Sequence, residues 1–232
     1  MITVRKADKM GSSHLGWLTS RFHFSFAEYY NPSNINYGVL RVLNDDRVQP
    51  GTGFDTHPHK DMEIISYIIQ GELTHQDNMG HKRSLTRGMI QYMSAGTGVL
   101  HSEHNQGKDL LRFLQIWIFP THKSLEPNYG DYEFPLNDRE GKWLHMVSGQ
   151  TKEAPVNIHQ DANIHSLILQ EEENNTFTIS QDRMGYLVQI EGQSQINNNL
   201  LEEGDAAELS EGEYKLNTQT MSHYLLIEMA QQ

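Results

Sequence analysis

The sequence predicts an all-β protein in which two similar barrels follow one another along the chain. Short apolar segments rich in β-branched residues are separated by Gly or Pro and show little helical periodicity, which is typical of barrels and sandwiches. Features of the first half recur in the second half, which indicates a duplicated unit. In the first half, metal-capable side chains also stand two residues apart, the spacing that places side chains on one face of a strand.

The first half contains a series of strand-like segments bounded by turn residues. They cover residues 38–43, 62–69, 89–93 and 111–119. The first is expected to end at the polar turn Asn44-Asp45-Asp46, and residues 77–80 (DNMG) predict a hairpin turn. Pro50-Gly51 opens a further segment, which carries two of the metal-capable histidines.

The boundary between the halves is expected after the last of these strands. Residues 120–141 lack periodicity and contain Pro, Asn, Asp and Gly, so they are interpreted as a linker or a long loop. A strand-rich pattern then resumes and continues to the C-terminus, with an acidic turn over 171–175. We therefore expect two domains, 1–125 and 126–232.

Short similarities between the halves support the duplication. The segment 67–71 (YIIQG) is matched by 186–192 (YLVQIEG). Gly88 and Gly96 are eight residues apart with a serine between them, and Gly204 and Gly212 repeat this arrangement. The second half is thus expected to fold as a second barrel of the same kind.

Two motifs in the first half carry the candidate chemistry: His57-Pro58-His59 and His101-Ser102-Glu103. If their strands face each other, three imidazoles and one carboxylate point at one position. Such donors suit iron, manganese, nickel, copper or zinc, and four ligands leave an octahedral metal with open positions for a substrate or dioxygen. Glu63 shares the strand parity of His59, so strand parity alone leaves Glu63 or Glu103 as the carboxylate ligand. Of the 13 histidines, the ten outside these motifs are interpreted as surface or core residues.

Alignment of the repeats predicts that the second barrel lacks this site. With Gly71 placed on Gly192 and Gly96 on Gly212, the positions of His57, His59, His101 and Glu103 are taken by Thr178, Ser180, Asn217 and Gln219. Hydroxyl and amide groups do not assemble a tight transition-metal site. We therefore expect metal in the N-terminal barrel only.

Composition excludes several classes of protein. The net charge of −12 and the absence of a basic cluster argue against direct nucleic-acid binding. Without cysteine the chain has no disulfide, thiolate ligand or cysteine nucleophile. No signal peptide and no membrane span is recognisable, so we expect a soluble, cytoplasmic protein. A chain of this size with two lobes is expected to be monomeric.

The motifs resemble those of a known superfamily and of one family within it. Gly51-x5-His57-x-His59-x3-Glu63-x7-Gly71 and Gly88-x5-Ser94-x-Gly96, followed by His101 and Asn105, resemble the two motifs of the cupin superfamily of double-stranded β-helix (jelly-roll) barrels. Ser94 stands where the general motif has Pro, and the last spacings are one residue longer. Residues 24–30, 40–46, 53–63 and 94–103 are similar to the pirin family.

The resemblance to pirins implies two consecutive cupin barrels packed together, with an iron-type site in the first. It implies His57, His59, His101 and Glu103 as metal ligands. Glu63 would then lie behind them and orient an imidazole through its second ring nitrogen. The cofactor is expected to be one divalent transition metal, Fe(II) in the first place, with manganese, nickel, cobalt, copper or zinc as alternatives.

Pirins are similar to quercetin 2,3-dioxygenases, so the resemblance also implies a reaction. A flavonol-like aromatic substrate and dioxygen would meet at the metal, and the ring would be cleaved with release of carbon monoxide. Glu103 would be both ligand and catalytic base. The alternative is a metal-containing regulatory pirin that binds a protein partner and has no dedicated catalysis.

Overall fold

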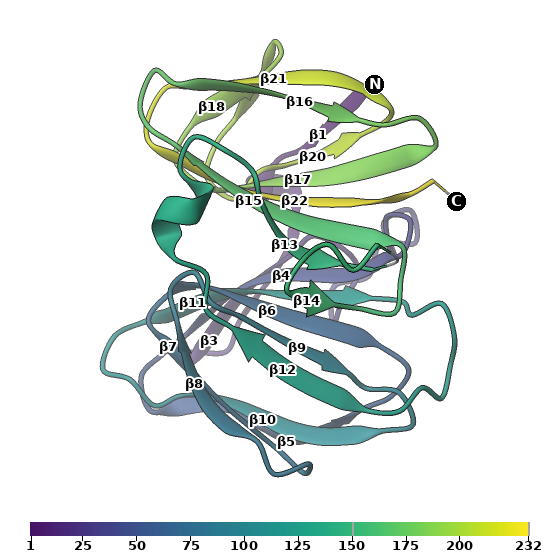
Figure 1. Cartoon of the computed structure of the whole chain (residues 1–232). Helices are drawn as coiled ribbons and strands as arrows, with labels where there is room; N and C mark the ends of the chain where they lie inside the picture. Colours follow the sequence, from purple (N-terminus) through teal and green to yellow (C-terminus); the bar gives the residue numbers. More distant parts are fainter. Residues whose placement is uncertain (150, 232) are drawn as a thin grey trace. The chain divides into compact units, whose positions relative to one another are not determined.

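The computed structural model describes residues 1–149 and 151–231 and shows an almost purely β architecture (Figure 1). Its strands run from β1 to β22, and the only helical segments among the described residues are the short 3₁₀ turns η1 (Ala7–Lys9) and η2 (Leu136–Arg139). No helix in this part of the chain is long and apolar enough to cross a membrane. The prediction of an all-β protein is confirmed.

The chain divides into two compact units. The N-terminal barrel consists of Gly11–Phe134 with Ile158–Gln160. The C-terminal barrel consists of Met1–Met10, Pro135–Asn157 and Asp161–Gln232. Strand pairing explains why this division differs from an expected boundary between residues 125 and 126.

Two strands belong to the other barrel than the one to which the expected boundary would assign them. β1 (Ile2–Arg5) pairs with β20 (Ala206–Leu209), so the first residues of the chain belong to the C-terminal barrel. β12 (Asn128–Tyr132) pairs with β9 (Ile90–Ser94), so part of the expected linker over 120–141 is a strand of the N-terminal barrel. The local sequence of β1 and β12 did not reveal these pairings, because edge strands are held by backbone hydrogen bonds to a partner far away in the sequence.

The N-terminal barrel contains a larger sheet in the order β12-β9-β6-β11-β4-β3-β2 and a smaller sheet in the order β5-β10-β7-β8. Neighbouring strands in both sheets are antiparallel. Besides β9 and β12, the strands are β2 (Gly11–His14), β3 (Leu18–Phe22), β4 (Leu40–Val48), β5 (Thr52–His59), β6 (Glu63–Gln70), β7 (Glu72–Asp77), β8 (Lys82–Thr86), β10 (Val99–Asn105) and β11 (Leu111–Ile118).

The C-terminal barrel repeats this plan, which confirms the duplicated fold. Its larger sheet has the order β1-β20-β17-β22-β15-β13-β14 and its smaller sheet the order β16-β21-β18-β19. Besides β1 and β20, the strands are β13 (Leu144–Ser148), β14 (Val156–Asn157), β15 (Ala162–Leu169), β16 (Asn174–Ile179), β17 (Arg183–Glu191), β18 (Ser194–Ile196), β19 (Asn199–Leu201), β21 (Gly212–Thr218) and β22 (Ser222–Ala230).

The expected turn at Asn44-Asp45-Asp46 is wrong: these residues lie in the middle of β4, and all three are buried. Nε and Nη2 of Arg112 on β11 donate to the two carboxylate oxygens of Asp45 at 3.0 and 2.8 Å. Burial alone would raise the pKa of Asp45, but the hydrogen bonds and charge of Arg112, with Arg47, hold it below its usual value. A polar triplet typical of turns therefore continues a strand, because the neighbouring strand supplies a cation for its middle residue.

Candidate metal centre

The two histidine motifs lie on neighbouring strands of the smaller sheet. β5 carries His57 and His59, and β10 carries His101, the cross-strand partner of His57. Because side chains two residues apart share one face of a strand, the three rings meet, and their centroids lie 4.5 to 4.9 Å apart. Nε2 of His101 lies 3.1 Å from Nε2 of His57.

A glycine-containing turn fixes the start of β10. Gly96 has a φ of +44°, and a Cβ at this position would lie 2.0 Å from the backbone oxygen of Leu125. Gly98 has a φ of +140°. Only glycine adopts such conformations without strain, so a side chain at either position would displace the strand that carries His101.

The ring nitrogens fit a metal ion. One nitrogen each from His57, His59 and His101 lies within 4.8 Å of the other two. Imidazole nitrogen binds a transition metal at about 2.0–2.1 Å, so neighbouring ligand atoms are about 3 Å apart and opposite ones about 4 Å apart. Imidazole suits zinc, copper, iron and nickel. The cluster therefore fits a divalent transition metal without selecting one.

Burial keeps two of these imidazoles in the metal-binding form. Together with neighbouring His57 and His75, burial lowers the pKa of His101 to about 3. Together with His101 and His57, it lowers the pKa of His59 to about 4. Neutral imidazole is the form that ligates a metal, so neither ring has to lose a proton at neutral pH before a metal binds.

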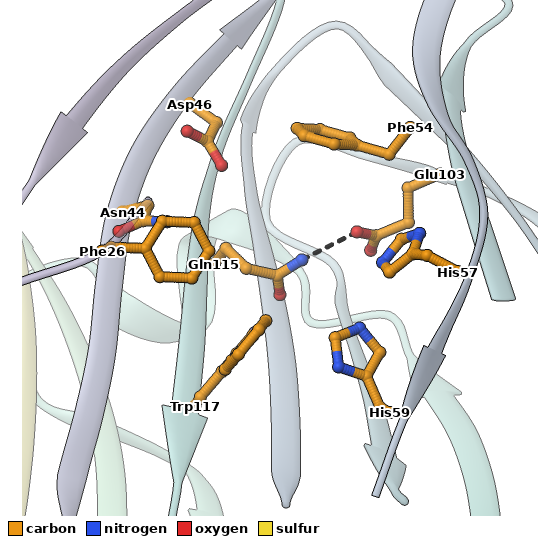
Figure 2. A pocket seen from close by; sticks show the side chains of 9 residues that line it. All are labelled: Phe26, Asn44, Asp46, Phe54, His57, His59, Glu103, Gln115 and Trp117. Carbon is orange, nitrogen blue, oxygen red and sulfur yellow. Dashed lines mark hydrogen bonds between the residues drawn. The ribbon is translucent and has the colours of Figure 1, made fainter. Parts of the chain in front are cut away.

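Glu103 lies two residues beyond His101 on β10 and is 2% exposed. Its Oε1 accepts hydrogen bonds from Ser66 Oγ at 2.9 Å and from Gln91 Nε2 at 2.5 Å. Its Oε2 accepts a hydrogen bond from Gln115 Nε2 at 2.7 Å (Figure 2). Donors from three different strands therefore hold this carboxylate beside the histidines.

The donors to Glu103 belong to one row of buried polar residues across the larger sheet. Asn44 on β4 pairs with Gln115 on β11, Gln115 with Ser66 on β6, and Ser66 with Gln91 on β9. We term these four residues the polar row. Buried polar groups cost free energy unless they are hydrogen-bonded, and Glu103 supplies acceptors for three of the four. Sequence reasoning missed the row because its four members lie on four separate strands, and Asn44 was assigned to a turn.

A fourth histidine also lies next to Glu103. His75 on β7 is the cross-strand partner of Glu103, and one of its ring nitrogens lies within 4.8 Å of donor atoms of His101 and Glu103. His75 Nε2 is 3.2 Å from Asp77 Oδ2, and the His75 ring stacks on Tyr129 with centroids 4.5 Å apart. The sequence placed His75 among the ordinary histidines, because its nearness to the cluster depends on the pairing of β7 with β10.

Glu63 has partners other than the three clustered imidazoles. It begins β6 and is buried, and its Oε2 accepts hydrogen bonds from Ser94 Oγ at 2.7 Å and from the backbone N–H of His159 at 3.1 Å. Within residues 1–149 and 151–231, no hydrogen bond joins Glu63 to a ring of the cluster. Glu63 therefore makes no direct hydrogen bond through which it could orient one of these imidazoles. Its carboxylate instead connects β6 to β9 and to residues 158–160.

A cavity of about 230 Å³ opens beside the histidines (Figure 2). Phe26, Phe54 and Trp117 give it an aromatic lining, and His57 and His59 face it from the smaller sheet. Trp117 also meets the His59 ring edge to face, with centroids 4.9 Å apart. The metal-binding nitrogens are thus next to a space suited to a flat, largely apolar ligand.

The C-terminal barrel has apolar residues where the N-terminal barrel has the cluster. β16 and β21 occupy the places of β5 and β10 in the sheet order, and Phe177 pairs with Tyr214 as His57 pairs with His101. The four corresponding residues are Phe177, Ile179, Tyr214 and Leu216, all buried in one apolar core. Among the residues that the structure describes, groups able to hold a metal occur only in the N-terminal barrel.

The sequence alignment of the two barrels was therefore out of register. It placed Thr178, Ser180, Asn217 and Gln219 at these positions, but Thr178, Ser180 and Gln219 are exposed and Asn217 is half-buried. A shift by an odd number of residues moves strand side chains to the opposite face. Glycines at or near the strand ends marked the repeat but did not fix the strand register.

Two barrels with one histidine cluster beside a cavity define a two-barrel cupin with a candidate metal centre. The family pattern described as pirin matches residues 3–118, and that described as the quercetinase C-terminal cupin domain matches residues 145–229. The chain belongs to the pirin family.

Similar proteins cover almost the whole chain. A pirin-like protein of Caulobacter vibrioides is 43% identical over 208 residues, which is 89% of this chain and 90% of that protein. A protein of Escherichia coli (strain K12) named quercetin 2,3-dioxygenase is 39% identical over 198 residues, covering 85% and 84% of the two chains. The crystal structure of the bacterial pirin YhhW from Escherichia coli in complex with nickel(II) has a TM-score of 0.93 and 34% identity, and all of both chains is covered.

Proposed function

We propose that this chain is a metal-dependent dioxygenase that cleaves a flavonol-like ring, as quercetin 2,3-dioxygenases do. One observation carries the proposal: an aromatic cavity opens beside three converging imidazoles and a carboxylate fixed by three donors. The relatives named quercetin 2,3-dioxygenase support the same reaction. The substrates would be a small planar aromatic molecule and dioxygen.

The metal ligands in this proposal are His57, His59, His101 and Glu103. The carboxylate is adjacent to His101. Its Oε1 accepts two hydrogen bonds, but its Oε2 accepts only one from the described residues and keeps a lone pair for a metal. A divalent transition metal held by this set would supply the Lewis acidity and redox chemistry for reaction with dioxygen. Fe(II) is the first candidate, and nickel(II), which the YhhW structure contains, is the second.

The chain's own residues would orient the substrate and accept a proton. The 3-hydroxyl and 4-carbonyl of a flavonol would face the histidine side of the cavity, with the rings against Phe54 and Trp117. Glu103 lines the same cavity and would accept the 3-hydroxyl proton at a carboxylate oxygen. The two oxygen atoms of dioxygen would then bond to C2 and C4 of the flavonolate. The O–O bond and both C–C bonds of C3 would break, so that C3 leaves as carbon monoxide with the former 3-hydroxyl oxygen.

A regulatory pirin without catalysis is the other function that the family allows. Such a protein needs an interaction surface beside the metal but no enclosed ligand space. The cavity between the histidines and β4 favours the enzyme, because it offers a small aromatic ligand direct access to the ligand atoms.

Oxygen uptake with quercetin, measured together with carbon monoxide release, tests the proposal. The purified chain is loaded in turn with Fe(II), Ni(II) and Mn(II) and compared with His101→Ala and His104→Ala. His104 lies on the same strand but outside the cluster, so its variant should keep metal and turnover whereas His101→Ala loses both. Absence of oxygen uptake by every loaded form, or equal uptake by His101→Ala, would refute the proposal.

A further inference from the structure

Two buried hydrogen-bond acceptors on β4 take no part in the proposed reaction. Asn44 and Asp46 are 3% and 4% exposed, and both line the cavity (Figure 2). Oδ1 of each side chain has no hydrogen-bond partner among the described residues. Buried polar atoms in folded proteins are nearly always paired, so unpaired acceptors on two residues that line one cavity point to a ligand that completes them.

These acceptors lie across the cavity from the histidines. Figure 2 shows Asn44 and Asp46 on the side away from His57 and His59. Gln115 stands between the two sides, because it is the cross-strand partner of Asn44 and donates to the carboxylate that lies beside the histidines. A ligand whose one end meets the histidines through this cavity therefore brings its other end to β4.

The chemistry of the two atoms restricts what that end carries. An amide oxygen and an ionised carboxylate only accept hydrogen bonds, so the ligand must donate. Burial, with the nearby charges of Asp45 and Glu103, raises the pKa of Asp46 to about 7, although a hydrogen bond from Ser20 acts in the opposite direction. In a cavity lined by Phe26 and Phe54, the donors that suit a flat aromatic ligand are ring hydroxyl groups.

We propose that Asn44 and Asp46 recognise hydroxyl groups on the end of the substrate remote from the metal centre, and that they select polyhydroxylated flavonols over those with the 3-hydroxyl alone. The identity of the substrate rests on the proposed function. The recognition itself concerns binding and does not depend on turnover.

Binding of quercetin and of 3-hydroxyflavone to the metal-loaded protein tests this inference. Both compounds carry the 3-hydroxyl and 4-carbonyl, and only quercetin carries further ring hydroxyls. Affinities are measured without oxygen at pH 8, where the Asp46 carboxylate is ionised. The wild type should bind quercetin more tightly, and Asp46→Leu should weaken quercetin binding by about 10- to 100-fold, as loss of a hydrogen bond to a charged acceptor predicts.

Two further variants sharpen the test. Asn44→Leu removes a neutral acceptor and should weaken quercetin binding by about 3- to 10-fold. Neither Asp46→Leu nor Asn44→Leu should change the affinity for 3-hydroxyflavone by more than about threefold, since that compound has no further hydroxyl group to donate to Asn44 or Asp46. Asp109→Leu replaces an exposed acid of the same barrel and should leave both affinities unchanged. Urea unfolding establishes that each variant is folded.

The outcomes separate this inference from the proposed reaction. Equal affinity of the wild type for the two flavonols, or equal weakening of both by Asp46→Leu, would overturn it. Hydroxyl-dependent binding in a protein that consumes no oxygen would uphold the recognition by β4 while refuting the dioxygenase. The affinities of the wild type for the two flavonols can be compared without any variant. The inference therefore remains testable even if Asp46→Leu folds poorly.

Discussion

Removing one donor of Glu103 should weaken metal binding while the barrel stays folded. Gln91 Nε2 donates to Glu103 Oε1 at 2.5 Å, and Gln91 is 1% exposed, so water does not take the place of a lost donor. Gln91→Leu keeps the approximate volume and removes the donor. Substitution of a group that hydrogen-bonds a metal ligand lowers metal affinity by about 10- to 100-fold, and we expect this rise in the dissociation constants for Fe(II) and Ni(II). The metal-free protein should lose about 1.5–3 kcal/mol of stability, the cost of a missing hydrogen bond to a charged group.

Competition with a chromophoric chelator measures the metal affinity, and urea unfolding of the metal-free protein measures stability. Gln76→Leu is the matched control, because Gln76 is exposed on β7 in the smaller sheet and should leave both quantities unchanged. A folded Gln91→Leu protein that bound metal within about twofold of the wild type would refute the reasoning, since the polar row would then not position a ligand.

Three further predictions concern stability. Burial raises the pKa of Asp46 to about 7 from an ordinary 3.8. Between about pH 4 and pH 7 the folded state therefore keeps a proton on Asp46 that the unfolded state loses, so the free energy of unfolding of the wild type falls as pH rises. Asp46→Asn should therefore gain up to about 4 kcal/mol relative to the wild type between pH 4 and pH 8 in urea titrations; a pH-independent difference would contradict this. Arg112→Leu leaves the Asp45 carboxylate buried without its bidentate partner and should cost about 3–5 kcal/mol at pH 7, whereas a loss below about 1 kcal/mol would show that the pair is not needed. Leu216→Ala should cost about 2–5 kcal/mol, because Leu216 lies in the apolar core, and Asn217→Ala less than about 1 kcal/mol; the reverse order in urea unfolding would overturn the register of β21.

The sequence predicted those parts of the molecule that depend on local periodicity. Strand parity alone placed His57 and His59 on one face, and the paired strand put His101 beside them. The duplication was visible in glycine spacing, and the structure confirms two barrels of the same sheet order. These features were accessible because each depends on residues within one strand or on turns at its ends.

What escaped prediction depends on pairings between distant strands. Asn44, Ser66, Gln91 and Gln115 become neighbours only through the register of four strands. The same dependence explains the error at residues 44–46, where local composition favours a turn but the partner strand supplies Arg112. Local rules describe a strand by its own sequence, whereas a buried polar residue is acceptable only if a distant strand completes its hydrogen bonds.

The contrast between the barrels shows that the candidate metal centre is encoded by both sheets of a barrel together. In the N-terminal barrel, Glu103 on the smaller sheet faces three donors on the larger sheet. In the C-terminal barrel, Leu216 on the smaller sheet shares one apolar cluster with Leu187, Ala207 and Leu226, which come from strands equivalent to those that carry the donors. A carboxylate on one sheet without donors on the other would be a buried charge that nothing compensates, and donors without the carboxylate would be unpaired polar groups. The two halves of such a site must therefore be gained or lost as a set, which accounts for apolar residues at the corresponding positions of both sheets in the C-terminal barrel.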